Sequence, residues 1–427
     1  MSSINLVDLT SQIEATVAST TDLQENEADR KRLLQACDQL RKELKSPFEF
    51  TLRTVFAKAG STSHLRGYMP QGYASIAVRL AIDMNLFNAV AQHSESSSEG
   101  TVTLSQLAET TKTDPLLVSR IMRFLSALGI FNQIEQDVYA STPLAAAYIS
   151  SSPLSAAVIH VTHFFMVLSQ LPAYFHGKGW QNPNNVLDGP FQYATGTKSH
   201  YFDFLAGEPY YQQAFNTVMI ISHRRQGQNW FDFFPVEEKL GGVTNDSDAL
   251  LVDVGGSQGG DIIAFQKQFP HVRGRLVLQD LPIVIEAIQE KEFPAGIEAQ
   301  GYDFFDEQPV KGARAYNLRT VLHDWPDAQA RQILARLREA MAPDSLLLIN
   351  ETLLPESKIA LSSAQADLTM MVSFAPLERT KAQFERLLNE SGFDLVNVWM
   401  PQGFTASSAE LASQATLLEA RLKGSSE

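Results

Sequence analysis

"LLVDVGGSQGGDIIAFQKQFP", residues 250–270, decides the fold of this chain. An apolar run typical of a buried strand ends in the glycine-rich residues 255–260, and a helical stretch follows. Glycines at such a turn let the backbone bend tightly and approach a ligand that a Cβ atom would repel. The Gly-Lys-Ser/Thr ending of a phosphate loop is missing. The stretch therefore predicts a strand, a turn and a helix, and it leaves open whether the turn binds anything.

Further strand-like runs alternate with helical stretches after residue 247. They are "ALLVDVGG" (249–256), "GRLVLQD" (274–280), "ARAYNLRTVL" (313–322) and "SLLLINETLL" (345–354). This alternation is typical of βαβ units, which build a parallel sheet covered by helices on both faces. We therefore predict an α/β fold whose ligands bind at the carboxyl ends of the strands.

Acidic residues follow the next two strand-like runs. Asp280 ends "RLVLQDLP", where a carboxylate can accept both hydroxyls of a ribose or, alternatively, cap the helix that starts near Pro282. Asp303 in "GYDFFDEQP" can accept a hydrogen bond from an adenine amino group while Phe304 packs on the ring face. With the glycine turn, these acids indicate a nucleoside cofactor without phosphates.

Composition restricts the partners and the compartment. The 427 residues suffice for two or three domains, and the net charge of −14 disfavours nucleic acid and anionic lipid. A single cysteine, Cys37, excludes an intramolecular disulfide. The first residues lack the pattern of a signal peptide, and we identify no apolar run long enough to span a bilayer. We expect a soluble, cytoplasmic protein with no nucleic-acid or membrane partner.

The N-terminal part reads as helical. The pattern of residues 25–46 predicts a charged amphipathic helix that Pro47 ends. Residues 74–92 form a helix that is apolar around most of its circumference, and a partner subunit is a plausible cover for it.

Residues 103–143 have a winged-helix pattern. A short helix precedes a longer one, for which Asp114 is the expected N-cap, Pro115 the first helical residue and Gly129 the end. Two β-like runs around an acidic tip follow. The second helix carries only two arginines, so a structural winged helix is favoured over a DNA-binding one.

Residues 153–235 are helical and unusually aromatic. Their rings could form a buried layer or a flat apolar pocket for an aromatic ligand. Later, "NLRTVLHDWPDAQARQIL" (317–334) places His323 where an apolar stretch ends. This histidine could be a general base or an ordinary polar residue at a loop mouth.

Several motifs together resemble one family, the natural-product O-methyltransferases of the caffeic-acid type that use S-adenosylmethionine in plants and fungi. The resemblance runs from about residue 25 to the end. Its motifs are "DMNLF" (83–87), "FNTVM" (215–219), "VDVGGSQGG" (252–260), "LQDLP" (278–282), "YDFF" (302–305), "LHDWPD" (322–327), "NETLLP" (350–355) and "LERT" (377–380). One departure is Ser257, where the family usually has a third glycine.

The resemblance implies a Rossmann-like methyltransferase domain that binds S-adenosylmethionine. The glycine turn would wrap the methionine part, Asp280 would hold the ribose, and Asp303 with Phe304 would frame the adenine. Arg319 stands where the family has a basic residue near the cofactor. The full set assigned to the cofactor is Asp253, Gly255, Gly256, Gly259, Asp280, Leu281, Asp303, Phe304 and Arg319.

The resemblance also makes His323 the general base that takes the proton from a phenol as its oxygen attacks the methyl group. Glu351 and Glu378 stand at the positions of two acids that orient this histidine. Asp324 would hold the loop, touch the substrate or cap the next helix. Glu378 could alternatively form a salt bridge with the adjacent Arg379.

The expected acceptor is a phenolic or enolic polyketide or alkaloid. By resemblance Met219 packs against it and Phe215 lies on the same helix face; His163 and Phe164 are further candidates, with His160 and Phe165. We expect a helical and winged-helix dimerisation domain (1–150), a helical substrate-binding segment (151–235) and the methyltransferase domain (236–427) of a homodimer. No metal site is expected, since no cluster has ligand spacing.

A rival hypothesis keeps the cofactor but not the methyl transfer. Some fungal members of the fold use the sulfonium charge to steer dehydration or pericyclic ring closure, and they lose the base histidine. His323 is intact here, although His160 and His163 could act as acid or base in such a reaction. A non-catalytic winged-helix regulator is disfavoured because the histidine and both acids are present.

Overall fold

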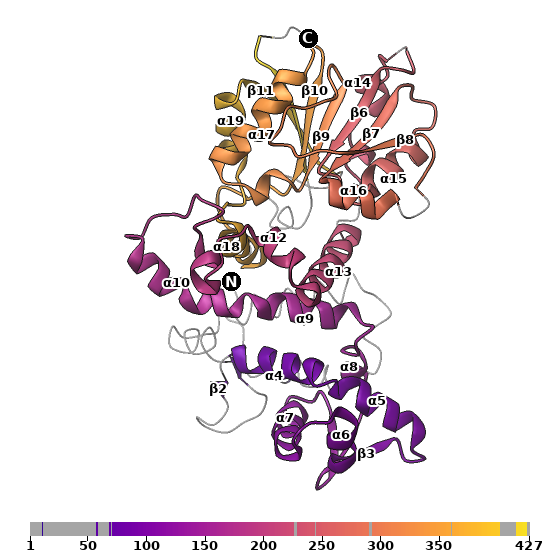
Figure 1. The fold of residues 1–427 in the computed structure, drawn as a ribbon, viewed down its shortest axis with the longest axis vertical. Coiled ribbons are helices and arrows are strands. Elements are labelled where there is room, and N and C mark those ends of the chain that lie inside the picture. The colour runs from indigo at the N-terminus through magenta and orange to yellow at the C-terminus, as the bar shows by residue number, and fades with distance from the viewer. Residues whose placement is uncertain are drawn as a thin grey trace.

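The computed structural model describes residues 71–225, 229–243, 245–289, 293–359, 361–401 and 416–424, with residue 11 and the pairs 57–58 and 68–69. The predicted helix 25–46 and Cys37 lie outside these residues. Strands β1 (Ala57–Lys58) and β2 (Tyr68–Met69) pair antiparallel. Figure 1 shows three tiers: a winged-helix unit, a helical layer and an α/β unit.

The winged-helix unit agrees with its prediction. The sheet order is β3-β5-β4, and Asp114 caps α7 by accepting the Leu117 N–H at 3.0 Å. Gly129 follows α7 with a φ of 76°. The elements are α4 (Gln71–Asp83), α5 (Leu86–Ser96), β3 (Thr101–Thr103), α6 (Leu104–Thr111), α7 (Pro115–Ala127), β4 (Asn132–Glu135), β5 (Val138–Ala140) and α8 (Pro143–Ala146).

The single helix predicted over 74–92 is wrong. Asn85 has a φ of 59°, in the left-handed region that a continuing α-helix cannot contain. The chain therefore forms two helices, α4 and α5, which meet at a bend of 62°. Asparagine tolerates this conformation better than most residues, so the break occurs there.

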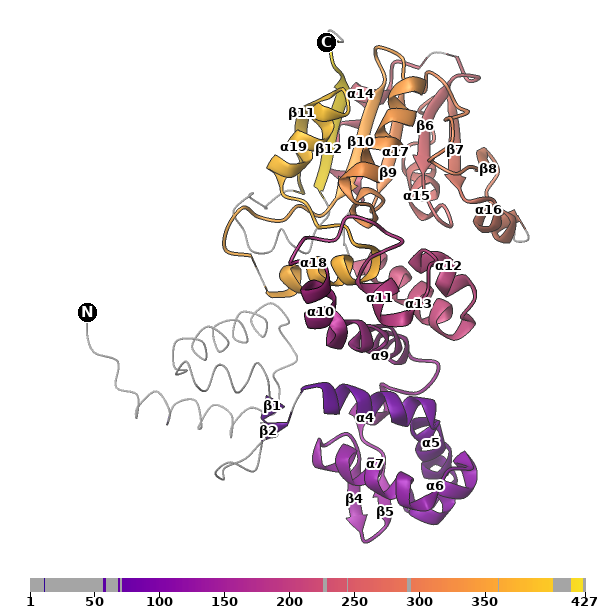
Figure 2. The same ribbon diagram turned by 60° about the vertical axis from the view of Figure 1, so that its left-hand side comes forward.

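The middle tier is the aromatic helical layer, and α18 (Leu361–Phe374) joins it from the C-terminal half (Figures 1 and 2). Helix α9 packs against both α13 and α4. The layer comprises α9 (Pro153–His163), α10 (Phe165–Gly177), α11 (Pro190–Thr195), α12 (Tyr201–Ala206) and α13 (Pro209–Arg225). The next elements, η1 (Trp230–Asp232) and α14 (Val236–Leu240), pack against the sheet of the α/β unit.

One apolar run in this layer corrects the sequence analysis. Residues Pro153–Gly177, which comprise α9 and α10, are long and apolar enough to cross a membrane by length and composition, with a hydropathy of 1.5. The expectation that no run is that long is therefore wrong. In this structure 33% of the most apolar 18-residue stretch of this segment is buried inside the protein.

The upper tier contains a seven-stranded sheet of order β11-β12-β10-β9-β6-β7-β8. The pairs among β10, β9, β6, β7 and β8 are parallel, whereas β12 lies antiparallel between β10 and β11. The strands are β6 (Ala249–Val254), β7 (Arg275–Asp280), β8 (Ile297–Gly301), β9 (Ala315–Arg319), β10 (Leu346–Glu351), β11 (Phe393–Trp399) and β12 (Thr416–Leu422). The predicted mostly parallel sheet is confirmed.

Helices cover both faces of this sheet, and each face has its own apolar core. One core includes residues of α17 (Asp327–Ala340) and α19 (Lys381–Glu390), and the other includes residues of α14, α15 (Gly260–Gln268) and α16 (Pro282–Gln289). Strand β6 has β7 on one side and β9 on the other, so the chain reverses its direction of travel across the sheet there. Ligands of such sheets bind beyond the carboxyl ends of the strands at this reversal.

Candidate active site

The glycine turn follows β6 at that reversal. The N–H groups of Gly255 and Gly256 donate to the carbonyl of Gln279 at 2.8 and 3.1 Å, which ties the turn to β7. A Cβ at Gly256 would lie 2.5 Å from Oδ2 of Asp253 and 2.5 Å from Leu278, so no larger residue fits. Gly255 and Gly259 have φ values of 72° and 76°, which favour glycine.

Asp280 contacts this turn directly. Its carboxylate accepts the N–H of Ser257 at 2.8 Å and that of Leu281 at 2.8 Å. Ser257, at the position where the family has glycine, has a φ of 51°. Burial raises the pKa of Asp280. Asp280 therefore orders the glycine turn.

The third predicted element lies beside the same turn. A Cβ at Gly255 would be 3.8 Å from the Phe304 ring, and Oδ1 of Asp303 accepts the Phe305 N–H at 3.0 Å. The structure thus brings the glycine turn, Asp280 and Phe304 together at consecutive strand ends.

A buried polar cluster lies below the turn. Oδ1 of Asp253 accepts from the side chain of Asn317 at 2.8 Å, while its Oδ2 has no hydrogen-bond partner among the described residues. Burial, reinforced by Asp261, raises the pKa of Asp253 to about 7. Arg319 forms an ion pair with Asp261. Sequence reasoning missed Asp261, because an acid in the first turn of a helix is common for reasons unrelated to ligands.

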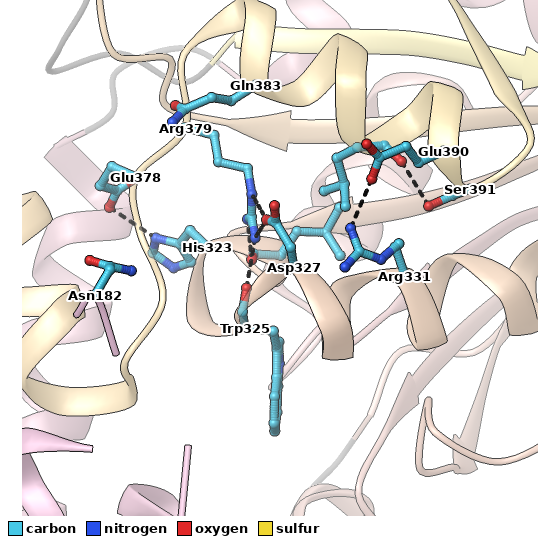
Figure 3. Close-up of polar contacts among 12 residues, drawn as sticks. Asn182, His323, Trp325, Asp327, Arg331, Glu378, Arg379, Gln383, Glu390 and Ser391 are labelled. Carbon is cyan, nitrogen blue, oxygen red and sulfur yellow. Dashed lines mark hydrogen bonds and ion pairs between the residues drawn. The ribbon is translucent and has the colours of Figure 1, made fainter. Parts of the chain in front are cut away.

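His323 does not lie at the end of a strand. β9 ends at Arg319, and Thr320 adopts a φ of 48°, so the strand predicted over 313–322 stops early. His323 instead lies in a short 3-10 turn, η2 (Leu322–Asp324). Its Nδ1 is 3.1 Å from Oε1 of Glu378 (Figure 3), and its Nε2 is 3.5 Å from Oδ1 of Asp324.

Glu351 holds the main chain of this turn. Its Oε1 accepts N–H groups of Val321, Leu322 and His323 at 3.1, 3.0 and 3.3 Å. Three successive amides pointing at one oxygen form an anion-binding nest. Glu378 contacts the ring, whereas Glu351 contacts the backbone that carries it.

The acids change the protonation of the site. Burial lowers the pKa of His323, but Asp324, Glu351 and Glu378 outweigh it and raise that pKa to about 10. Burial raises the pKa of Asp324 to about 6 and that of Glu351 to about 7. At neutral pH the resting imidazole therefore holds a proton.

Two alternatives from the sequence are resolved by the geometry. The residue before α17 is Pro326, without a side-chain cap, so Asp324 does not cap that helix. Arg379 pairs with Asp327 at 2.8 Å, so its charge is used there and not on the adjacent Glu378.

The predicted substrate residues lie in the aromatic layer. Phe164 is buried and Phe215 packs partly buried against the same cluster, while Met219 is 41% exposed. The His163 ring lies 4.1 Å from Tyr211, and its Nε2 has no partner within the part of the chain that is described. Burial lowers the pKa of His163 to about 4, and the same holds for His160. Both rings are therefore neutral.

His200 connects this layer to the histidine turn, and sequence reasoning missed it. Its ring stacks on Trp325 at 4.9 Å with an interplanar angle of 8°. A hollow of about 290 Å³ lies here, and its lining includes none of the predicted substrate residues. The lining residues are Val186, Leu187, His200, Phe305, Trp325, Gln329 and Gln332.

A mostly parallel sheet with a glycine turn and acids at the next strand ends is an arrangement that suits a nucleoside cofactor. The O-methyltransferase domain matches residues 184–394, and the O-methyltransferase dimerisation domain matches residues 67–151. O-methyltransferase penC of Penicillium thymicola is 36% identical over 327 residues, 76% of this chain and 80% of that protein. The demethylsterigmatocystin 6-O-methyltransferase of Aspergillus flavus is 30% identical over 319 residues, 74% and 80%. The chain belongs to the family of S-adenosylmethionine-dependent O-methyltransferases.

Solved structures share the whole fold. OxaC, solved in complex with sinefungin and meleagrin, has a TM-score of 0.75 at 25% identity and covers 98% of this chain and 100% of its own. A structure described as a pericyclic reaction enzyme has a TM-score of 0.73 at 24% identity, with coverages of 98% and 99%. The second likeness concerns the fold alone.

The residues present fit S-adenosylmethionine, the cofactor of the family. Glycine is required at Gly256 because Asp253 and Leu278 fill the space of a Cβ, which keeps the turn packed closely on the strand ends where a nucleoside cofactor binds. Buried Oδ2 of Asp253 is an acceptor that suits a ligand donor or cation, since an unpaired buried carboxylate oxygen is costly.

Proposed function

We propose that the enzyme methylates a hydroxyl group of a phenolic or enolic natural product, with His323 as general base. One observation carries the proposal. The imidazole of His323 lies between the carboxylates of Glu378 and Asp324. Its turn is next to the glycine turn, since a Cβ at Gly255 would lie 3.0 Å from the Val321 side chain. A base and a cofactor site are thus adjacent.

The chemistry of such a site is simple. S-adenosylmethionine supplies a methyl group on a sulfonium that is already a good leaving group. The chain must hold the acceptor oxygen in line and take its proton. Neutral His323 receives that proton at Nε2, while Glu378 accepts the hydrogen bond from Nδ1–H. The three acids raise the pKa of His323, which makes the imidazole a stronger base toward a phenol.

The cofactor roles extend the sequence expectations. Asp280 and Leu281 would hold the ribose, Asp303 and Phe304 the adenine, and the glycine turn the methionine part. Support comes from their placement around one turn. Arg319 would act indirectly, by holding Asp261 under that turn.

The acceptor would lie against the aromatic layer. His163, Phe164, Phe215 and Met219 are the proposed contacts, and neutral buried histidines suit an apolar planar ring. A phenolic or enolic polyketide or alkaloid is proposed because one relative is named for methylating demethylsterigmatocystin and OxaC was solved with meleagrin.

We also propose a homodimer built through residues 1–150, with substrate contacts from 151–235 and cofactor binding by 236–427. The match to the dimerisation domain supports the pairing. So do the exposed apolar side chains of α4, which are Tyr73, Ile76 and Leu80. Sedimentation of a 47.3 kDa monomer at micromolar concentration would contradict it.

Methyl-labelled S-adenosylmethionine and a pool of phenolic precursors test the reaction, with products measured by mass spectrometry. Label in a product with the wild type, and its loss in His323→Ala, is the expected result. The rival reaction, dehydration or pericyclic ring closure without methyl transfer, predicts an unlabelled product of altered structure that forms only with the cofactor. That product would overturn the proposal.

A further inference from the structure

Arg379 is a buried cation that the reaction described above does not use. Its residue is 1% exposed. Nη1 donates to the carbonyl of Leu322 at 2.7 Å, and Nη2 donates to the carbonyl of Trp325 at 2.8 Å (Figure 3). Nε and Nη2 also donate to Oδ1 of Asp327 at 3.1 and 2.8 Å. The two carbonyls flank His323 and Asp324 in the chain.

Arg379 and Glu351 bind complementary groups of one turn. Glu351 accepts N–H groups from residues 321–323, and Arg379 donates to carbonyls of residues 322 and 325. The turn needs such support, because Thr320 at its start is β-branched and has a φ of 48°. Such a conformation persists only where the surroundings impose it.

The same short segment also holds the imidazole. Glu378 directly precedes Arg379 and contacts Nδ1 of His323 at 3.1 Å. The N–H of Glu378 donates to Oδ1 of Asp367 on α18 at 2.9 Å. Segment 378–379 is therefore fixed to the helical layer, and it contacts both the ring and its backbone.

We propose that Arg379 is a positioning residue for His323. Arg379 fixes the position and orientation of the turn, so that the imidazole ring lies next to Glu378 and Asp324. The inference rests on the proposed role of His323 as base. A planar guanidinium can bond two carbonyls and a carboxylate at once, whereas a lysine ammonium is a point charge on a flexible stem. The role therefore depends on the shape of the cation.

The test follows the His323 ring by NMR of the full-length enzyme with ¹³C-labelled histidine, and His323→Asn assigns its resonance. The variants are Arg379→Lys, which keeps the charge, and Arg379→Met, which removes it. Arg314→Met is the matched control, because Arg314 donates to the carbonyls of Lys239 and Asp344 next to the start of β9, at the opposite end of the strand from His323. No acceptor is needed for this measurement.

The direction in which the pKa of His323 changes distinguishes a positioning role of Arg379 from a purely electrostatic one. Removing a nearby cation would raise the pKa of an imidazole. Loss of position moves the ring away from its carboxylates, so the pKa of His323 falls toward 6.5. We expect the proton affinity of His323 to be at least tenfold weaker in both Arg379 variants and unchanged in Arg314→Met. An unchanged or raised pKa in Arg379→Lys overturns the inference, and the conservative variant keeps the test valid where Arg379→Met does not fold.

A kinetic experiment completes the test once an acceptor is found. Arg379→Lys should lower the maximal kcat, reached at alkaline pH where His323 is neutral, with little change in KM, and the affinity for S-adenosylhomocysteine, measured by calorimetry, should stay within twofold. A rise in KM alone contradicts positioning. The two proposals can fail separately. Undiminished methyl transfer by the His323→Ala variant would contradict the role of His323 as base. The NMR measurement tests the role of Arg379 without any methyl transfer.

Discussion

His323 and Glu378 come from segments 55 residues apart, and Nδ1 of the one lies 3.1 Å from Oε1 of the other. The carboxylate favours the tautomer with its proton on Nδ1, which leaves the lone pair on Nε2. Asp324 is 3.5 Å from that second nitrogen. The pair therefore selects which nitrogen accepts a proton, and Asp324 with Glu378 sets how strongly it is held.

The pH dependence of kcat/KM should be alkaline. The base must be neutral, and the pKa of His323 is raised to about 10, so kcat/KM should rise with pH through the neutral range and level off near pH 10. A profile from pH 6 to 10.5 with a fixed acceptor measures this. A limb centred near 6.5 would show that the acids do not act on the ring.

Glu378→Gln should move that limb to lower pH, because it removes a carboxylate that raises the pKa of His323. The maximal rate should fall about 10- to 100-fold, since the ring loses its orienting acceptor. Glu339→Gln is the matched control, because Glu339 is a half-exposed acid on α17 that pairs with Arg336. An unshifted limb with a lower rate would mean that Glu378 orients the ring without changing its basicity.

Gly256→Ala should weaken cofactor binding. The added Cβ would lie 2.5 Å from Asp253 and from Leu278, both of them buried, so the turn must move. We expect S-adenosylhomocysteine to bind at least tenfold more weakly by calorimetry. Gly242→Ala is the control, because a Cβ there has no neighbour within 4 Å. Equal affinities in the two variants would remove the glycine turn from the cofactor site.

Asp280→Asn should weaken the cofactor through two effects. The new amide cannot accept both ribose hydroxyls. In the wild type the Asp280 carboxylate accepts the N–H of Ser257, whereas in the variant the amide N–H groups would face that donor. Leaving such a donor unpaired costs about 1–3 kcal/mol, or about 5- to 150-fold in affinity. Calorimetry with S-adenosylhomocysteine measures it, and wild-type affinity would exclude a ribose role for Asp280.

Glu351→Gln should change how stability depends on pH. Burial raises the pKa of Glu351 from 4.5 to about 7, so the native state binds the extra proton and stability is lost as pH rises through that interval. Glutamine keeps an acceptor for the three amides and does not titrate. Relative to wild type, the variant should gain about 1–3 kcal/mol in free energy of unfolding between pH 5 and 8. Urea titrations at both pH values test this, and a parallel pH dependence contradicts it.

The sequence predicted what periodicity and glycine placement determine. The buried run ending at Gly255 predicted the sheet, and the acid at Asp280 was expected beside the glycine turn because parallel strands bring their ends to one edge. It missed the helix break at Asn85 and the early end of β9 before Thr320. Both depend on a left-handed residue. Asn85 is a residue type that tolerates this conformation, so it gave a weak signal, whereas the β-branched Thr320 gave none.

The partners of the turn were also beyond the sequence. Glu351 was expected at the ring and holds main-chain amides; Arg379 was considered for Glu378 and binds two carbonyls and Asp327. Nearly every residue has the same main-chain N–H and C=O groups, so the sequence does not indicate which side chains will bind them. Their partners are set by the tertiary packing that brings β10 and segment 378–379 to the turn.

Strand β12 fixes the order in which the site can mature during synthesis. It lies between β10 and β11, its Thr416 is paired with Glu351, and the Thr416 hydroxyl donates to the Glu351 carbonyl at 3.0 Å. Residues 416–422 emerge from the ribosome after every other residue of the site. Until they insert, β10 keeps an open edge next to the acid that holds the histidine turn. A chain released before residue 416 should therefore be inactive, with its catalytic turn unformed, however completely its glycine turn has folded.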